Sequence, residues 1–478
     1  MLTAGPRFTD FQQALHQNKT SCVDRVRHHL SVIEEKSHLN VFLGVYGEEA
    51  LKQAATIDQK IKEGTAGKLA GLVVGLKDVF SYQGHPLQAG SKILDGFIAQ
   101  YNATIVGRLL KEDAIIIGRQ NCDEFAMGSS NENSAFGPTL NCVDESRVPG
   151  GSSGASAVAV AAGMCQVSIG SDTGGSVRQP AAFCGVAGLK PTYSRISRYG
   201  LVAYASSFDC VGVFAKNIED IALVLEVIAG KDDMDSTVSS RPVPPYTSYL
   251  GQHEEKKYRV AYLNEALRPG ALQPAIKNAL QHKIDQLATA GHRVEGIDFP
   301  LMGQALPTYY ILATAEASSN LSRYDGVRYG YRSHNTTDLE SLYKKTRAEG
   351  FGKEVQRRIL LGTFVLSASY YDAYYTKAQK VRHLIRKKTK EVFEKHDFII
   401  MPTTPTTAFK LGEKTEDPTA MYLADLFSVH ANVAGVPALS VPCGTDGEGL
   451  PIGLQIVADD FDEARLFQFS KVLMNFEK

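Results

Sequence analysis

The 478-residue sequence has a formal net charge of only −1 and no long hydrophobic run. Its 51 basic residues are balanced by 52 acidic ones, whereas a protein whose main surface binds nucleic-acid phosphates needs an excess of positive charge. The longest nearly uncharged apolar tract, at 155–165, is too short to span a bilayer, and the N-terminus lacks the pattern of a signal peptide. We therefore expect a soluble, cytoplasmic protein that contacts no membrane and serves nucleic acid only indirectly.

The placement of cysteine and histidine in the sequence disfavours disulfide bonds, a zinc site and a histidine base near the serine clusters. The seven cysteines are scattered and show no C-x-x-C spacing, which disfavours a disulfide framework and a zinc site, so we expect no metal. Histidine is absent from 86–252, the stretch that contains two clusters of glycine and serine. A serine nucleophile in either cluster would have no histidine base near it in the sequence.

Short β-branched segments alternate with longer segments of helical period, which predicts an α/β fold with a helix-covered, largely parallel or mixed sheet. The expected strands are 70–80, 114–118, 166–170, 258–263 and 397–402, and the expected helices are 9–36, 48–64, 104–112, 152–163, 217–230 and 275–291.

We expect one domain over residues 1–478, with a helical region at about 7–65 packed on it. Residues 231–249 contain three prolines and interrupt the periodic pattern. Because a strand-like segment follows at once, we interpret them as a long surface connection within the domain rather than as a linker between two domains.

The first cluster, GSDTGGSVRQPAA at 170–182, follows a strand-like segment and leads into a helix-like one. Its glycines permit a turn in which the amides of Thr173, Gly174, Gly175 and Ser176 point at one spot. Such a nest suits a bound phosphate or the oxyanion of an acyl-transfer intermediate. A glycine-rich loop without chemistry is the alternative.

The second cluster, RVPGGSSGASAVAVAAG at 147–163, matches the G-x-S-x-G nucleophile elbow around Ser152. An elbow requires a strand that delivers the serine, and the preceding CVDESRVP is polar and ends in proline. It also requires a histidine base. We therefore disfavour an α/β-hydrolase.

Lys77, near the end of the apolar segment GLVVGLKDVF, is a possible base. Burial would have to lower its pKa by about 3 units to make it competent near pH 7. The alternative is a surface lysine, or one paired with the adjacent Asp78.

In combination, Lys77 in GLKD, Ser152 in PGGSSG and Ser176 in GSDTGGSVRQPA resemble the amidase signature family, from about residue 7 to the C-terminus. The resemblance implies a large twisted mixed sheet covered by helices on both faces. It also implies Ser176 as the nucleophile, Ser152, after a cis peptide bond, as a bridging hydroxyl, and Lys77 as the base. A second hydroxyl between the nucleophile and a neutral lysine would supply the missing relay.

Segments 121–141, 315–330, 352–382 and 424–444 are similar to the glutaminase subunits of tRNA-dependent amidotransferases. That similarity implies ammonia transfer from glutamine to a B subunit, which uses ATP and Mg²⁺ to amidate a mischarged Glu-tRNA(Gln) or Asp-tRNA(Asn). A small C subunit would complete a heterotrimer, the charged tRNA would be held mainly by B, and the glutaminase chain would need no cofactor.

At matching positions, the resemblance implies that Arg358 holds the glutamine carboxylate and Asp425 its ammonium, as suits their charges. Arg357 remains an alternative to Arg358. The resemblance also implies that Tyr309 contacts the substrate, with Tyr310 as the alternative. Met127 and Gly128 match a segment that lines the acyl pocket.

Two positions depart from the family pattern: Ala155 replaces a glycine and Cys122 replaces a methionine. If position 155 required a positive φ, alanine would be strained there by about 1 kcal/mol.

Two further functions stay open. One is a stand-alone amidase acting on another small amide, and the other is a non-enzymatic protein whose turns bind an anion. The basic run at 377–390 could touch tRNA, but its charges fall around much of a helix, which favours a solvated helix face.

Overall fold

The computed structural model describes residues 5–251, 256–268, 270, 272–415 and 417–475, and in this part of the chain eleven strands form one sheet. In their order across the sheet, the strands are β1 (Phe42–Val45), β3 (Ile115–Gln120), β2 (Val73–Lys77), β4 (Val167–Asp172), β6 (Cys210–Ala215), β5 (Ala187–Lys190), β10 (Ala438–Thr445), β11 (Pro451–Val457), β9 (Phe398–Pro402), β7 (Arg259–Leu263) and β8 (Arg293–Ile297). Strand β2 is parallel to β3 and β4, and β7 is parallel to β8 and β9. The other neighbours are antiparallel. The expected mixed α/β fold is confirmed.

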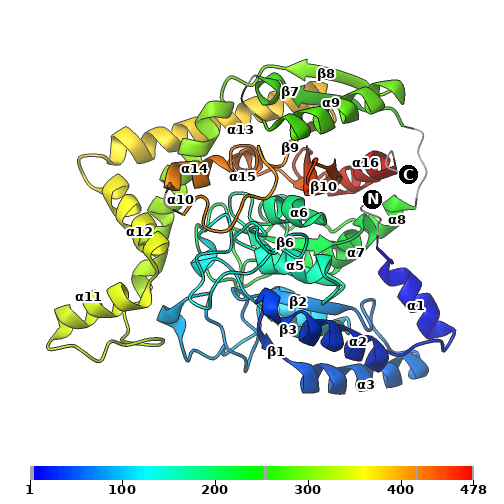
Figure 1. Cartoon of the computed structure of the whole chain (residues 1–478), viewed down its shortest axis with the longest axis horizontal. Helices are drawn as coiled ribbons and strands as arrows, with labels where there is room; N and C mark the ends of the chain where they lie inside the picture. The colour runs from blue at the N-terminus through cyan, green and yellow to red at the C-terminus, as the bar shows by residue number, and fades with distance from the viewer. Residues whose placement is uncertain (1–4, 252–255, 269, 271, 416, 476–478) are drawn as a thin grey trace.

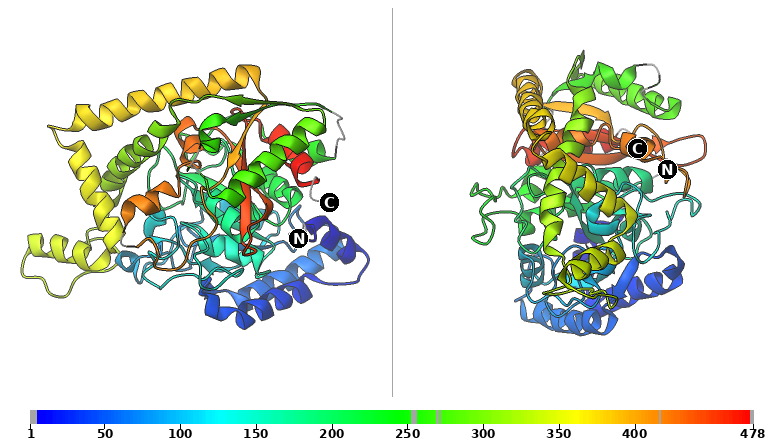
Figure 2. Two further views of the ribbon diagram at one scale, coloured as in Figure 1. Left: turned by 45° about the horizontal axis from the view of Figure 1, so that its top comes forward. Right: turned by 90° about the vertical axis from the view of Figure 1, so that its left-hand side faces the viewer.

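Helices pack along both faces of the sheet (Figures 1 and 2). They are α1 (Phe8–His16), α2 (Cys22–Glu35), α3 (Gly47–Glu63), α4 (Thr104–Lys111), α5 (Gly154–Ala161), α6 (Arg178–Cys184), α7 (Ile218–Ile228), α8 (Tyr246–Leu250), α9 (Pro274–Thr289), α10 (Met302–Asn320), α11 (Leu339–Gly350), α12 (Lys353–Leu366), α13 (Lys377–Lys395), α14 (Pro418–Leu423), α15 (Val429–Ala434) and α16 (Glu463–Asn475). Helices α11 and α12 form the arm at the left of Figure 1. None of the described helices is long and apolar enough to cross a membrane.

The site is positioned by two neighbouring strands, β2 and β4. Both are buried along their whole length, as parallel strands covered on both faces should be. Because they run parallel, their carboxyl ends lie at the same edge of the sheet. Strand β2 ends at Lys77, and β4 ends at Asp172, immediately before the 173–176 turn.

The region expected to be helical over 9–36 forms two helices, because the chain breaks between α1 and α2. Asn18 adopts a φ of 53° after α1. Ser21 then caps α2, its hydroxyl accepting a hydrogen bond from the Asp24 amide at 3.0 Å. A polar residue that tolerates left-handed geometry and a capping serine therefore divide the apolar periodicity into two helices.

Residues 231–249 are fastened to the body of the molecule. The Arg195 guanidinium donates to the carbonyls of Arg241 and Pro242 at 3.3 and 3.0 Å, and the Tyr246 side chain is buried. The chain then re-enters the same sheet at β7.

The basic run 377–390 lies entirely in α13, whose side chains divide between the protein and solvent. Arg382 donates to the Ser207 hydroxyl and carbonyl. One turn further on, Arg386 pairs with Asp460, and Lys390 pairs with the same carboxylate. These three residues, spaced four apart, face the body of the protein, where Arg382 binds neutral groups and the other two bind a carboxylate.

Candidate active site

Lys77 is fully buried and surrounded by hydroxyl groups. Its Nζ lies 2.7 Å from Oγ of Ser152 and 2.9 Å from Oγ of both Ser153 and Ser171. Asp78 instead pairs with Arg119 at 2.9 Å. Lys77 is therefore neither a surface lysine nor the partner of its neighbour.

Burial disfavours the charged form of Lys77 and lowers its pKa to about 8, although the nearby carboxylates of Asp123 and Asp172 act in the opposite direction. Such a lysine is neutral in about one molecule in ten at pH 7, compared with about one in 2,500 for an exposed lysine. The Lys77 amine can therefore accept a proton under physiological conditions.

The two serine clusters meet at this lysine. Ser152 follows a cis peptide bond at Gly151, as the resemblance implies. The amide of Ser153 donates to the Ser176 carbonyl at 3.2 Å, which joins the two turns. Among the described residues, the Ser176 hydroxyl has no hydrogen-bond partner, and its side chain is 8% exposed. It is therefore free to meet a ligand.

The 173–176 turn differs from its predicted geometry at one residue. The Gly175 amide donates to Asp172 Oδ1 at 2.9 Å, so it is not available to an oxyanion as predicted. Within the described residues, the amides of Gly174 and Ser176 have no acceptor. Thr173 is fixed through its hydroxyl, which donates to Asp209 at 2.7 Å.

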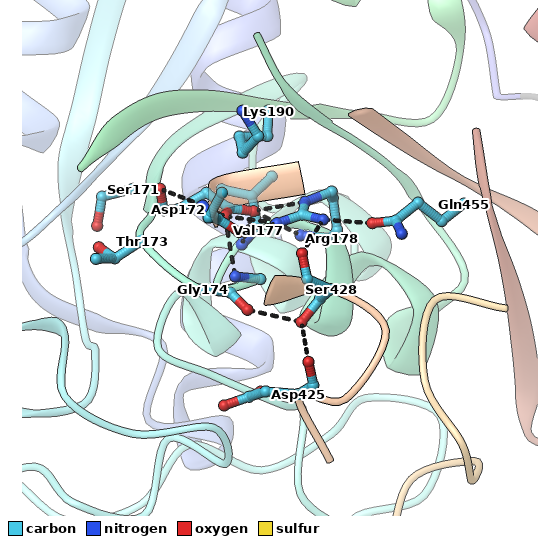
Figure 3. A network of polar contacts seen from close by, with 12 residues as sticks. Ser171, Asp172, Thr173, Gly174, Val177, Arg178, Lys190, Asp425, Ser428 and Gln455 are labelled. Carbon is cyan, nitrogen blue, oxygen red and sulfur yellow. Dashed lines mark hydrogen bonds and ion pairs between the residues drawn. The ribbon is translucent and has the colours of Figure 1, made fainter. Parts of the chain in front are cut away.

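A buried ion pair that was not predicted from the sequence lies beside this turn and holds it (Figure 3). Arg178 donates to both carboxylate oxygens of Asp172, at 3.0 and 2.9 Å, and to the Ser428 carbonyl at 2.7 Å. It also binds the side chains of Asn432 and Gln455. Burial alone would raise the pKa of Asp172, but the adjacent guanidinium outweighs it and lowers the pKa to about 2. Asp172 therefore stays ionised and holds the turn.

Of the two adjacent arginines, Arg358 points inward and Arg357 outward. The Arg358 side chain is 3% exposed and that of Arg357 is 47% exposed. Arg358 donates through Nε to Glu354 at 2.8 Å and through Nη1 to the Tyr204 hydroxyl at 2.9 Å. Its Nη2 has no partner among the described residues, and this is the atom left to bind an anion.

Asp425 is held in a comparable way. Its Oδ2 accepts hydrogen bonds from the hydroxyls of Ser129 and Tyr310, both at 2.8 Å, whereas Oδ1 has no partner within the described part of the chain. Burial raises the pKa of this carboxyl to about 6. Tyr310 thus reaches Asp425, while Tyr309 packs its ring over Gly174, where an added Cβ would lie only 2.4 Å from the ring.

A cavity of about 250 Å³ opens beside these groups. Its lining residues are Gly128, Ser130, Glu132, Asn133, Lys353, Glu354, Arg357, Arg358, Lys414, Thr415, Met421 and Tyr422. Met127 is buried next to this lining, and Lys77, Ser152 and Ser176 are not part of it. The Ser130 hydroxyl is buried and has no partner among the described residues, so it is a further polar group available to a ligand.

Ala155 and Cys122, which depart from the family pattern, both fit the structure at their positions. Ala155 lies in α5 with helical geometry rather than at a positive φ, so the anticipated strain does not arise. Cys122 is buried, and burial raises the pKa of its thiol, which stays protonated.

The sequence reasoning missed Ser153 and Ser171 beside Lys77, and Ser129, Glu354 and Tyr204 around the two charged groups. Ser153 and Ser171 stand in the motifs themselves, next to Ser152 and Asp172. The other three come from separate parts of the chain. Ser129 and Glu354 lie within the segments 121–141 and 352–382, whereas no local pattern marks Tyr204.

A sequence model of the amidase family, described as "Amidase", matches residues 24–467. The chain therefore belongs to the amidase family, which confirms the resemblance inferred from the motifs around Lys77, Ser152 and Ser176.

Relatives that resemble this chain closely in sequence share one name. The chain is 54% identical to the A subunit of the glutamyl-tRNA(Gln) amidotransferase of Koribacter versatilis, over 91% of this chain and 90% of that protein. It is 50% identical to the protein of the same name from Chlorobium phaeobacteroides, over 98% and 99%. The crystal structure of the A subunit of the Thermotoga maritima glutamyl-tRNA(Gln) amidotransferase superposes with a TM-score of 0.76 at 37% identity, covering 94% of this chain and 90% of that one.

Proposed function

We propose that this chain is the glutamine-hydrolysing component of a tRNA-dependent amidotransferase. One observation carries the proposal. A buried lysine that is partly neutral at pH 7 contacts Ser152 at 2.7 Å, at the edge of the sheet where Ser176 also lies. Membership of the amidase family and the names of the relatives support the same activity.

The hydroxyls around Lys77 support its role as a base. A neutral amine has two N–H donors and one lone pair. The Ser153 hydroxyl donates its only proton to the Ser171 carbonyl at 3.0 Å, so it can only accept from Lys77. If the second N–H binds the Ser171 hydroxyl, the lone pair faces Ser152. The Ser152 proton can then pass to Lys77, and Ser152 can take one from Ser176 once the two hydroxyls, which are not hydrogen-bonded in the structure, come into contact.

In the reaction, Ser176 Oγ attacks the side-chain carbonyl carbon of glutamine as its proton moves through Ser152 to Lys77. The amides of Gly174 and Ser176 stabilise the oxyanion. The carbon–nitrogen bond breaks and ammonia leaves with the returned proton. Water then hydrolyses the acyl-enzyme ester, and glutamate is released.

The free atoms of Arg358 and Asp425 explain the choice of glutamine. Nη2 of Arg358 suits the α-carboxylate and Oδ1 of Asp425 suits the α-ammonium. A simple amide offers neither charge. Gly128 lines the same cavity as Arg358, and it cannot carry a side chain, because an added Cβ would lie 2.3 Å from the Asp123 carboxyl carbon.

The proposal includes partners that the relatives' names suggest. A B subunit would take up the ammonia and, with ATP and Mg²⁺, amidate Glu-tRNA(Gln) or Asp-tRNA(Asn), and a C subunit would complete the heterotrimer.

The test is a glutaminase assay of the purified chain with and without co-expressed partner subunits. We expect glutamate release, stimulated by ATP and charged tRNA in the complex. Ser176→Ala should abolish both turnover and the acyl-enzyme that hydroxylamine traps. Wild-type turnover in this variant would refute the assignment, and turnover of other small amides in preference to glutamine would favour a stand-alone amidase.

A further inference from the structure

Ser428 occupies the space between the Asp425 side of the pocket and the 173–176 turn. Its side chain is fully buried, and its Oγ donates to the Gly174 carbonyl at 2.6 Å and faces the Asp425 carbonyl at 3.1 Å. Figure 3 shows the hydroxyl between these two residues. No other side chain of the described residues makes a hydrogen bond to both.

The contact fixes one peptide plane of the turn. The peptide between Gly174 and Gly175 is held at its carbonyl by Ser428 and at its amide by Asp172, at 2.9 Å. The peptides on either side carry the amides of Gly174 and Ser176. Because neighbouring planes share a Cα atom, the orientation of the clamped plane constrains both of these amides.

The glycines of the turn match this arrangement. A Cβ on Gly175, which has a φ of 129°, would lie 2.1 Å from Ser428 Oγ. A Cβ on Gly174 would meet the ring of Tyr309. Ser428 and Tyr309 therefore leave no space for a side chain at Gly175 or at Gly174.

Asp425 and Ser428 belong to a single turn of the chain. The Ser428 amide donates to the Asp425 carbonyl at 3.1 Å, and the Ser428 carbonyl accepts from Arg178 at 2.7 Å. The backbone of Asp425 cannot shift without moving Ser428. The Asp425 carboxylate, by contrast, is held by Ser129 and Tyr310, so loss of the Ser428 hydroxyl leaves the ammonium site in place.

We propose that Ser428 is a positioning residue that couples occupation of the Asp425 site by the substrate ammonium to the alignment of the amides of the 173–176 turn. The inference rests on the proposed function and deepens it. Binding of the α-ammonium would then raise the rate of the chemical step as well as the affinity for the substrate. An amide without the α-amino group would react slowly even when it is bound.

The test compares glutamine with glutaramate, which carries the same side-chain amide and carboxylate but no α-amino group. In the wild-type complex, we expect the kcat for glutamine to exceed that for glutaramate. Ser428→Ala should lower the glutamine kcat by about tenfold, the size of effect expected for one buried hydrogen bond, with the glutamine KM nearly unchanged. The kcat for glutaramate should change by less than about twofold.

Equal losses of kcat for the two substrates would mean that Ser428 only supports the turn, and would overturn the coupling while leaving the proposed function intact. Absence of glutamine hydrolysis in the wild-type complex would refute the proposed function itself. Ser470→Ala is the matched control: this serine is also fully buried, but its hydroxyl donates to the Leu466 carbonyl in α16, and both kcat values should be preserved.

A second variant keeps the proposal testable if Ser428→Ala does not fold. Asp425→Asn removes the charge at the ammonium site. Coupling requires that it lower the glutamine kcat to near the value for glutaramate, as well as raise KM. A rise in KM with an unchanged kcat would overturn the inference.

Discussion

The lowered pKa of Lys77 gives the sharpest prediction, because the base must be neutral to act. With a pKa of about 8, the neutral fraction increases about eightfold between pH 6.5 and 7.5 and about threefold between pH 7.5 and 8.5. Because the neutral amine is the active form, kcat/KM for glutamine should rise with pH and level off above about 8. Asp425, with a pKa of about 6, is mostly ionised over this range.

Substitution of Lys77 tests the same reasoning. Lys77→Ala should lower kcat by about 10²–10⁴-fold, as expected for loss of a general base. Lys77→Arg keeps a long cationic side chain that does not deprotonate in this range, so it should be equally inactive at every pH. The matched control is Lys190→Met, because Lys190 is also fully buried but donates to the Pro191 carbonyl at 2.7 Å. Its profile should still bend near pH 8.

Steady-state glutaminase kinetics from pH 6.5 to 8.5, with glutamate measured directly, provide the assay. A wild-type kcat/KM that is flat, or that falls as the pH rises, would refute the role of a neutral lysine. So would a Lys77→Arg variant that keeps most of the wild-type rate.

Three further predictions concern substrate binding and stability. Arg358→Lys should raise the glutamine KM at least about tenfold, because an ammonium cannot keep the forked contacts of a guanidinium. Arg357→Lys should change KM less than about twofold, because lysine keeps the positive charge of this half-exposed side chain at the cavity. Similar KM values for the two variants would contradict the assignment. The glutamine KM should rise as the pH falls below about 6, where Asp425 takes up a proton, and a KM that does not change between pH 5 and 7 would speak against its role. Ala155→Gly should lower the free energy of unfolding in urea by about 0.5–1 kcal/mol, since position 155 is helical, and stabilisation would show that the position favours glycine.

The sequence alone determined the class of fold and the chemistry of the reacting groups. The segments 70–80 and 166–170 were predicted as strands, and Lys77 near the end of the first was a possible base, a role that the resemblance to the amidase signature family then implied. Ser152 and Ser176 stand in short glycine-rich turn motifs, and Lys77 stands at the end of an apolar strand. The absence of histidine between 86 and 252 then left a lysine as the base to consider.

Only the tertiary structure decided how the parts of the site support one another. The choice between Arg357 and Arg358 depends on which face of α12 turns toward Tyr204, about 150 residues away in the chain, and no periodicity within α12 encodes it. The same holds for Ser428 above the 173–176 turn. A pKa near 8 for Lys77 also requires the three hydroxyls and the surrounding core together, because desolvation is a property of everything packed around a group rather than of its neighbours in sequence.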